Sequence, residues 1–366
     1  MKFVCQKSEL LEHLQHAQSV VNPRTTLPIL SNIYIEAKDK YIEIISTDLE
    51  ISIHSLCPAK VSEKGNTTIP ARKFFDIVKN LPDEPITVKV NDSNVAEITC
   101  KKNIHFKLVG LPGEDFPKLP NFNKADSWDI DSKDMKKVIK KTSFAASRDE
   151  NHYVLNGIYF VFSGNKLTAV ATDGRRLSLV KLERGKKKDV KADFIVPIKT
   201  INELSKLLDS SESIKVYYMG NQVKFEAGDF SLITKLIEGT FPDYEAVIPK
   251  DSGPTAVINR NIFLEALQRT SLFTSDRASS VKLMFTKDSC VLSANTPELG
   301  EAKEEIEIEY DGGDFIIAFN PAYLIDVMKN IEEEKFFFIF PEKSTAGLIK
   351  TDGDFLYVIM PMRITD

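Results

Sequence analysis

The chain contains the stretch Ala169-Val170-Ala171-Thr172-Asp173, an apolar, strand-like run that ends in Thr-Asp. A matching run, Ile44-Ile45-Ser46-Thr47-Asp48, lies 125 residues earlier. A third and more diverged version is Leu292–Asn295. A repeat period of this length is the size of a domain rather than of a solenoid unit. The sequence therefore predicts three copies of one domain.

Further markers recur with nearly the same spacing. Each Thr-Asp run or its counterpart is followed by a second short apolar run, at Thr68–Pro70, Ile195–Pro197 and Ala318–Asn320. Phe116-Pro117 in the first copy is matched by Phe241-Pro242 in the second. We expect the domains to span residues 1–122, 123–250 and 251–366.

Each copy predicts the same order of elements. A short alternating strand comes first, at Lys2–Gln6, Trp128–Asp131 or Ala256–Asn259, and an amphipathic helix follows it. Alternating strands, a second helix and more strands complete the copy. The helices are expected at 8–21, 70–81, 132–147, 197–209, 260–270 and 320–331. Two helices laid on about eight antiparallel strands per copy make an α+β fold.

Two helix starts carry capping residues. Ser132 is the expected N-cap of the helix at 132–147, and Asn259 or Asn261 fills that place in the third copy. The second helix of each copy has Pro70, Pro197 or Pro321 near its first turn, where a missing N–H costs nothing.

Composition and motifs exclude several classes of function. No stretch of 18 apolar residues is present, and the N-terminus lacks the apolar core of a secretory signal. The four cysteines, Cys5, Cys57, Cys100 and Cys290, show no CxxC spacing and are predicted to be buried free thiols. No nucleotide-binding, protease or hydrolase motif occurs, and the histidines show no metal-ligand spacing. We therefore expect no cofactor, no metal and no catalytic residues.

Charge is distributed unevenly along the chain. The net charge is −5, yet the six expected helices hold 13 Lys or Arg and 8 Asp or Glu. Five of the basic residues belong to the helix at 132–147. A basic helix is most often only a solvated face, but equivalent helices that collect the positive charge of an acidic protein favour a polyanion facing them.

A set of motifs in this order and spacing resembles a known family along the whole chain. The motifs are Thr26–Leu30 with Asn32, Thr47–Glu50, Pro70–Phe75, Leu155–Gly157, Ala171–Leu177, Phe241–Tyr244 and Tyr357–Ile364. The family that they resemble is the bacterial DNA polymerase III beta subunit, the replicative sliding clamp.

The resemblance implies a fold and a function. Two chains would pair head to tail, each forming half of a closed ring that encircles duplex DNA without reading its sequence. The protein would catalyse nothing itself but would confer processivity on the replicative polymerase. It would be cytoplasmic, associated with the nucleoid and replisome. Further expected partners are the clamp loader, repair polymerases and mismatch-repair factors, which would dock through short peptide motifs.

The resemblance also implies three sets of site residues. The partner-peptide pocket would be formed by Leu155, Thr172, Gly174, Arg176, Leu177, Pro242, Val247, Asn320, Tyr323, Val358, Met360, Pro361, Met362 and Arg363. DNA would be contacted by Arg24, Arg72, Lys73, Lys136, Lys137, Lys140, Lys141, Arg148 and Lys199. The dimer interface would contain Lys102, His105, Phe106, Lys107, Leu272, Phe273, Glu298, Glu301 and Glu304.

The residues give independent support of different strength to these sites. A basic run at 101–107 and an acidic run at 298–309 are complementary, which favours pairing of two strand edges. Met360 and Met362 flank a proline near the chain end, which suits an adaptable binding surface. Here Arg176 and the tail are expected to close the rim of the pocket.

Some positions depart from the family pattern, and alternatives stay open. Glu245-Ala246 stands where the family often has basic residues, Ala278 where it can have a large aromatic residue, and Thr365-Asp366 extends the usual end. A clamp paralogue specialised for repair or resistance fits the same motifs. An enzyme with an active site between domains is the alternative from another class, although no catalytic constellation supports it.

Overall fold

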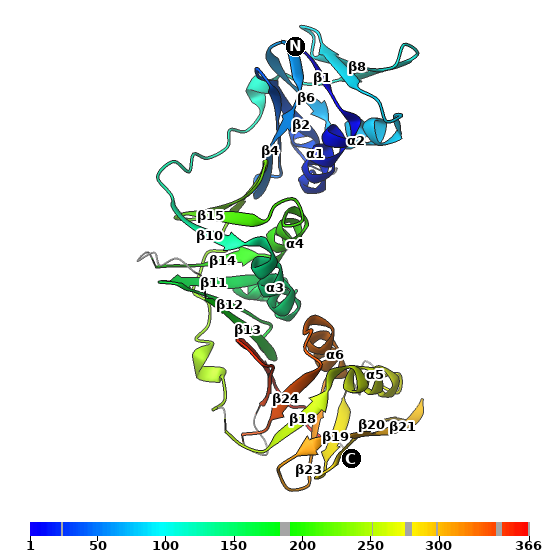
Figure 1. Cartoon of the computed structure of the whole chain (residues 1–366), viewed down its shortest axis with the longest axis vertical. Helices are drawn as coiled ribbons and strands as arrows, with labels where there is room; N and C mark the ends of the chain where they lie inside the picture. The colour runs from blue at the N-terminus through cyan, green and yellow to red at the C-terminus, as the bar shows by residue number, and fades with distance from the viewer. Residues whose placement is uncertain are drawn as a thin grey trace. The chain divides into compact units, whose positions relative to one another are not determined.

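We describe the protein from a computed structural model, whose described residues are 1–22, 25–183, 191–250, 252–274, 280–297, 299–341 and 346–364. The chain forms two compact units, whose helices and strands are labelled in Figure 1. Unit 1 comprises Met1–Met135 and Asn202–Leu236, and unit 2 comprises Lys136–Ile201 and Ile237–Asp366. The expected second copy therefore contributes to both units.

Unit 1 holds the first copy and part of the second. Its helices are α1 (Lys7–Val20) and α2 (Ala71–Asn80). A five-stranded sheet has the order β5 (Lys60–Glu63), β1 (Lys2–Cys5), β7 (Ile86–Val90), β8 (Val95–Cys100) and β9 (Ile104–Val109). An eight-stranded sheet has the order β10 (Asp126–Asp131), β15 (Ser213–Met219), β16 (Gln222–Ala227), β17 (Phe230–Lys235), β4 (Ile51–Pro58), β3 (Tyr41–Thr47), β2 (Asn32–Ala37) and β6 (Gly65–Pro70). All of these pairs are antiparallel, and the pairing of β17 with β4 joins the second copy to the first.

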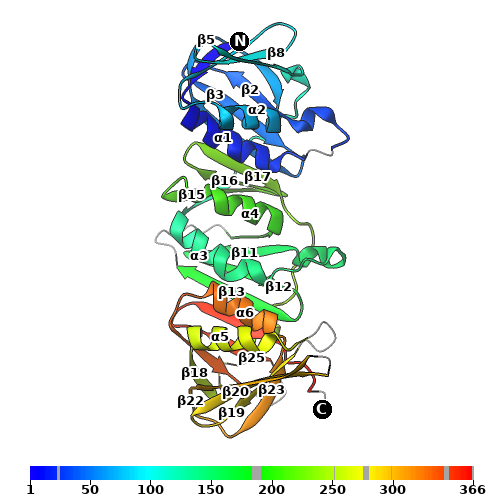
Figure 2. The ribbon, with the colours of Figure 1, turned by 90° about the vertical axis from the view of Figure 1, so that its right-hand side faces the viewer.

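One apolar core holds the two helices of the first copy to both sheets. It contains Leu10 of α1, Phe74 of α2, Phe3 of the five-stranded sheet and Ile44 of the eight-stranded sheet, all fully buried. Helices α1 and α2 lie side by side against this core (Figure 2). The alternation of buried and exposed residues along β4 and β8 explains why one face of each strand reaches the core.

Unit 2 holds the rest of the second copy and the third. A nine-stranded sheet has the order β14 (Ala192–Pro197), β11 (Gly157–Ser163), β12 (Lys166–Thr172), β13 (Arg176–Glu183), β26 (Phe355–Ile359), β25 (Gly347–Lys350), β24 (Lys335–Ile339), β18 (Thr255–Asn259) and β22 (Glu309–Tyr310). A four-stranded sheet has the order β21 (Gly300–Glu307), β20 (Ser289–Thr296), β19 (Val281–Phe285) and β23 (Phe315–Phe319). Helices α5 (Arg260–Ser271) and α6 (Pro321–Asn330) lie side by side. Two further helices, α3 (Ser132–Thr142) and α4 (Ile198–Leu207), include residues of both units.

Three isolated bridges mark one point of the fold in each copy. They pair Thr68 with Leu111, Ile195 with Ile237, and Ala318 with Met362. The first member of each pair belongs to the second apolar marker found in the sequence. The structural repeat therefore follows the sequence repeat.

Most expected elements are present with small changes at their ends. Helix α3 ends at Thr142 rather than at residue 147, and residues Ser143–Ala145 form a 3-10 turn. Asp131, not Ser132, caps α3, since its side chain accepts a hydrogen bond from the Lys133 N–H at 2.8 Å. In the third copy the cap is Asn259, which accepts from Asn261 and Ile262. All four cysteines are buried free thiols, as predicted.

Among the described residues, no helix is both long enough and apolar enough to cross a membrane.

Candidate functional site

The turn between β12 and β13 has a fixed shape because its own side chains hold its backbone. Thr172 Oγ1 donates to the Arg176 carbonyl at 2.6 Å and accepts from the Gly174 N–H at 3.1 Å. Asp173 Oδ1 accepts from the N–H groups of Arg175 and Arg176, both at 3.0 Å. Gly174 has φ +85°, a conformation that favours glycine. Thr172 and Gly174 thus set the turn.

The Arg176 side chain is mostly buried and has several partners within the protein. Its side chain is 10% exposed, and its Nε donates to Asp173 Oδ2 at 3.0 Å. Its Nη1 donates to Asp326 Oδ2 at 2.7 Å, and its Nη2 donates to the Phe144 carbonyl at 2.8 Å. The guanidinium also lies 4.4 Å from the centre of the Tyr323 ring.

These contacts give Arg176 a structural role that the sequence did not predict. The guanidinium fastens the 172–176 turn to α6 and to the 3-10 turn that follows α3. The sequence did not identify Asp173, Asp326 or Phe144 as partners of Arg176. Asp326 and Phe144 are distant from Arg176 in the sequence, so no local motif indicates them.

The last segment of the chain begins as a strand and ends as an exposed apolar surface. Residues Phe355–Ile359 pair with β13, and Leu177 faces Val358 in this register. Beyond the strand, the Met360 N–H donates to the Arg175 carbonyl at 2.9 Å, and the Met362 N–H donates to the Ala318 carbonyl at 2.7 Å. The backbone is therefore fixed, while the side chains of Met360 and Met362 are 51% and 37% exposed.

An apolar cluster connects three segments of unit 2. It includes Leu155, Leu177, Phe241 and Val358, with Tyr244 and Ile248 packed against it. Val247 belongs to the same segment as Tyr244 and is 57% exposed. Buried side chains thus support exposed ones in a surface that can accept an apolar ligand.

The remaining residues of the predicted pocket have more varied positions. Asn320 caps α6, because its side chain accepts from the Ala322 N–H at 2.9 Å. The Tyr323 carbonyl accepts from the Tyr357 hydroxyl at 3.0 Å. Pro242 and Arg363 are exposed, and Pro361 is half-buried.

The basic candidates for contacting DNA differ in their exposure. Arg72 and Lys73 are exposed in the first turn of α2. Lys137, Arg148 and Lys199 are also exposed, and Lys136 is half-buried. Arg24 lies outside the described residues.

Two lysines of α3 pair with carboxylates of a distant loop. Lys140 Nζ lies 2.6 Å from Glu332 Oε1, with its side chain 44% exposed. Lys141 Nζ lies 2.6 Å from Glu333 Oε1, with its side chain only 3% exposed. The structure therefore contradicts the prediction that Lys141 contacts DNA, since its charge is buried and paired within the protein.

Exposed apolar side chains mark the predicted dimer surfaces. On β9, Phe106 is 40% exposed, and its neighbours Lys102, His105 and Lys107 are exposed. After α5, Leu272 is 73% exposed and Phe273 is half-buried. Glu301 is exposed on β21, and Glu304 pairs with Arg269 at 2.6 Å. Glu298 and Ala278 lie outside the described residues, as do Thr365 and Asp366.

Comparison with known proteins identifies close similarities over the whole chain. The models of the DNA polymerase III beta subunit match residues 1–120 with the N-terminal domain, 129–243 with the central domain and 245–363 with the C-terminal domain. The beta sliding clamp of Chlamydia muridarum is 33% identical over 366 residues, covering all of both chains. That of Pseudomonas aeruginosa is 33% identical over 369 residues, again covering all of both chains.

Solved structures of sliding clamps are also similar to this chain over its whole length. The crystal structure of the Pseudomonas aeruginosa sliding clamp bound to griselimycin has a TM-score of 0.95 to this chain at 33% identity, with 100% of both chains covered. The Bacillus subtilis DNA polymerase sliding clamp has a TM-score of 0.95 at 31% identity, also with 100% of both chains covered. The expected α+β architecture of three repeated domains is confirmed by these matches.

Proposed function

Because this chain belongs to the DNA polymerase III beta subunit family and is a DNA sliding clamp, we propose that it works as a homodimeric ring around duplex DNA. In this role it gives the replicative polymerase its processivity and catalyses no reaction itself. The three domains of each protomer end near residues 122, 250 and 366. The observation that carries the proposal is the exposure of Phe106, whose counterparts in the other two copies are fully buried.

Neighbouring copies are connected within the chain by two strand pairs, which we call the internal joins. They supply the template for a third join, between two protomers. In unit 1, β4 of the first copy pairs with β17, the last strand of the second copy. In unit 2, β13 of the second copy pairs with β26, the last strand of the third copy. The corresponding strands that are left are β21 of the third copy and β9 of the first. Each is the end strand of its sheet in the described part of the chain.

Phe106 occupies the same place on β9 as two buried residues on the internal joins. It lies five residues before the bridge residue Leu111, as Leu232 precedes Ile237 and Tyr357 precedes Met362. Leu232 and Tyr357 are 0% exposed and lie on strands that pair with a neighbouring copy, whereas Phe106 is 40% exposed. A second protomer that continued the pattern would cover Phe106.

The same repeat predicts which residue of the partner protomer contacts Phe106. Leu272 lies twelve residues after the first residue of α5, as Phe144 lies twelve residues after the first residue of α3. The Phe144 and Tyr357 rings are 5.8 Å apart in the internal join. Leu272, which is 73% exposed, would therefore pack on Phe106 of the partner. Basic Lys102 and Lys107 would then face the acidic strand β21, which adds charge complementarity.

The contact with DNA is proposed to be weak and independent of sequence. The candidates that keep exposed basic side chains are Arg72, Lys73, Lys137, Lys140, Arg148 and Lys199. Exposed charges are screened over about 8 Å at physiological salt, so each contributes little. Affinity for short linear duplex should fall steeply as salt rises, because binding releases counterions. Retention on closed circular DNA would then depend on the ring and not on these contacts.

The exposed surface above the apolar cluster of unit 2 is proposed as the docking groove for partner peptides. Val247, Met360 and Met362 would line it, and the cluster with Leu155, Leu177 and Val358 would form its floor. Methionine side chains adapt to different ligands, which suits a groove shared by several partners. The polymerase catalytic subunit, the clamp loader, repair polymerases and mismatch-repair factors would compete for it.

The test of the ring is the dimerisation of Phe106→Ala measured by sedimentation velocity. We expect the parent chain to be a dimer at low micromolar concentration and Phe106→Ala to be a monomer. Ile316→Ala is the matched control, since Ile316 is 52% exposed on β23, at the opposite edge of the four-stranded sheet from β21. The parent should also stay on nicked circular DNA and leave the same DNA once it is linearised. A dimer that is unaffected by Phe106→Ala would rule out this interface.

A further inference from the structure

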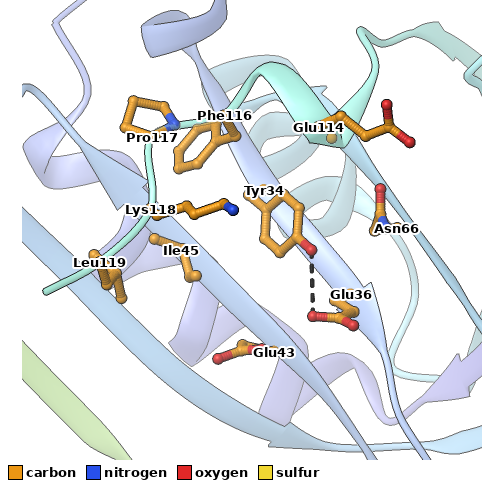
Figure 3. A pocket seen from close by; sticks show the side chains of 11 residues that line it. Tyr34, Glu36, Glu43, Ile45, Asn66, Glu114, Phe116, Pro117, Lys118 and Leu119 are labelled. Atoms are coloured by element: carbon orange, nitrogen blue, oxygen red, sulfur yellow. Dashed lines mark hydrogen bonds between the residues drawn. The ribbon is translucent and has the colours of Figure 1, made fainter. Parts of the chain in front are cut away.

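The first copy carries an open pocket in unit 1 that the proposed clamp function does not use. It has a volume of about 330 Å³ and lies between the outer face of β2 and β3 and the segment 113–119 (Figure 3). Tyr34 and Phe116 supply aromatic faces to it, and Glu36, Glu43 and Glu114 supply carboxylates. The only basic residue of the lining is Lys118.

The second copy shows why this pocket is open. There, Tyr159 stacks on Phe241 with ring centres 4.8 Å apart and planes within 8°, and Tyr244 meets Tyr159 edge-on at 6.2 Å. The counterparts in the first copy, 125 residues earlier, are Tyr34, Phe116 and Leu119. Leucine replaces the third ring, and the Tyr34 and Phe116 rings are 5.7 Å apart and tilted by 31°. The space that the Tyr244 ring fills in the second copy is therefore more open in the first.

The charges of the pocket also differ from those of the second copy. Glu36 and Glu43 stand where the second copy has Val161 and Thr168. Glu43 is 17% exposed and already accepts hydrogen bonds from Lys38 at 2.5 Å and from His54 at 2.8 Å. Glu36 is more accessible, at 34%. Its Oε2 accepts from the Tyr34 hydroxyl at 3.2 Å and lies 3.4 Å from Lys38 Nζ, so Lys38 is shared between Glu43 and Glu36.

Figure 3 shows that the Lys118 side chain extends across the pocket toward the Tyr34 ring. Lys118 is an exposed residue of the 113–119 segment, and its side chain points into the pocket near the ring. A cation there is attracted by the electron-rich faces of the rings and by the carboxylates around them.

We propose that this pocket docks an arginine side chain presented by a peptide segment of a partner protein. A planar guanidinium can stack on Tyr34 or Phe116 and donate a pair of hydrogen bonds to Glu36, with Glu114 adding a second negative charge. The volume suits one long side chain with its neighbours at the mouth. Such a site would act independently of the groove of unit 2.

The experiment measures binding of the peptide acetyl-Leu-Arg-Leu-amide to the full chain by saturation-transfer NMR. The same peptide with citrulline in place of arginine keeps the shape and removes the charge. Free argininamide tests whether the ligand is a small amine rather than a peptide. Variants are Glu36→Gln, which removes the proposed acceptor, and Lys118→Ala, which removes the cation that points into the pocket. Asp193→Asn is the control at the closed aromatic stack, where Asp193 accepts from the Tyr159 hydroxyl.

We expect the arginine peptide to bind, with Glu36→Gln weakening it about tenfold and Lys118→Ala strengthening it. Asp193→Asn should leave the affinity unchanged, and citrulline should abolish binding. Thermal unfolding midpoints equal to that of the parent chain would establish that the variants are folded. Equal binding of the citrulline peptide, or an unchanged affinity in Glu36→Gln, would overturn the site. Binding of argininamide as tight as that of the peptide would overturn its assignment to a protein partner. Deleting the unit 2 groove residues Met360–Arg363 should not alter this binding, which separates the inference from the proposed function.

Discussion

The two internal joins between copies have the same backbone and different side chains. In unit 1, the Lys235 N–H donates to the Glu50 carbonyl at 3.0 Å, and in unit 2 the Met360 N–H donates to the Arg175 carbonyl at 2.9 Å. At the other end of each strand pair, the Leu56 N–H donates to the Asp229 carbonyl, and the Lys181 N–H donates to the Asp354 carbonyl. These donors and acceptors correspond at an interval of 125 residues. The sheet pairing of the joins is therefore conserved between the copies.

The helix next to each join makes different side-chain contacts with the paired strands. His16 of α1 and Lys141 of α3 hold equivalent places, nine residues after the first residue of their helices. In unit 2, Lys141 lies over the Phe355 ring at 5.3 Å and pairs with Glu333. In unit 1, His16 meets the equivalent ring of Phe230 edge-on at 4.9 Å.

The unit 1 join has no counterpart of the buried ion pair at this point in the described structure. His13 stacks on Phe230 at 4.6 Å, and Ser19 donates to Glu203 at 2.6 Å. A cavity of about 530 Å³ adjoins His16, Lys206 and Asp209. The difference teaches that backbone pairing defines the join, while its strength and its response to pH are set by a few side chains.

The largest expected effect comes from removing the guanidinium of Arg176. Arg176→Ala would leave the Asp173 and Asp326 carboxylates and the Phe144 carbonyl without their donor. Loss of one partner from a mostly buried ionic network costs about 3–5 kcal/mol. Urea unfolding, with amide exchange of β13 and β26 as the local probe, measures the loss. Its matched control is Arg175→Ala, an exposed neighbour whose removal should change stability by less than about 0.5 kcal/mol. Similar effects of the two substitutions would contradict the role given to Arg176.

A smaller loss should follow from neutralising the carboxylate beside Lys141. Burial raises the pKa of Glu333, but hydrogen bonds from Lys141 and from backbone N–H groups outweigh burial and lower it to about 2. Glu333→Gln would leave a buried ammonium unpaired, at a cost of about 3 kcal/mol. Glu332→Gln, at the exposed Lys140 pair, should cost less than about 1 kcal/mol.

The double variant Lys141→Met, Glu333→Gln tests the cause. It should recover most of the stability that Glu333→Gln loses, because it removes the unpaired charge as well. If the double variant is no more stable than Glu333→Gln alone, the buried charge is not the reason for the loss.

The repeat made the architecture predictable, but it did not predict where every helix ends. Five of the six helices were expected within two residues of their bounds, since their apolar periodicity follows from packing on a sheet. The predicted end of α3 was too late in the sequence. Ala145, Ala146 and Ser147 are buried, so the apolar pattern continues after the helix has ended. Periodicity reports burial and does not by itself report helical backbone.

The site was predictable where its residues lie in local motifs and not where distant segments meet. Thr172 and Gly174 form a turn whose spacing is visible in the sequence. Lys141 and Glu333 are 192 residues apart, and nothing in a run of five lysines distinguishes the one that is buried. The exposure of Phe106 became informative only when its counterparts Leu232 and Tyr357 were located on the internal joins.

The smallest effect is a difference in acid sensitivity between the two joins. Burial lowers the pKa of His13 to about 4, against the opposing charge of Asp229 and with a minor contribution of the same sign from His16. Burial also lowers the pKa of His16. Since the unfolded chain binds these protons near pH 6.5 and the folded chain does not, stability is lost as pH falls from about 6.5 toward 4.

Glu333 acts in a lower window, because its depressed pKa costs stability only as pH falls below about 4.5 toward 2. At pH 5 the unit 1 join should therefore be weaker by about 2 kcal/mol than at neutral pH, while the unit 2 join is little changed. Amide exchange in β4 and β17, compared with β13 and β26, measures this difference. His13→Leu should remove most of the acid sensitivity of the unit 1 strands. Equal acceleration of exchange in both joins between pH 7 and pH 5 would show that the histidines do not distinguish them.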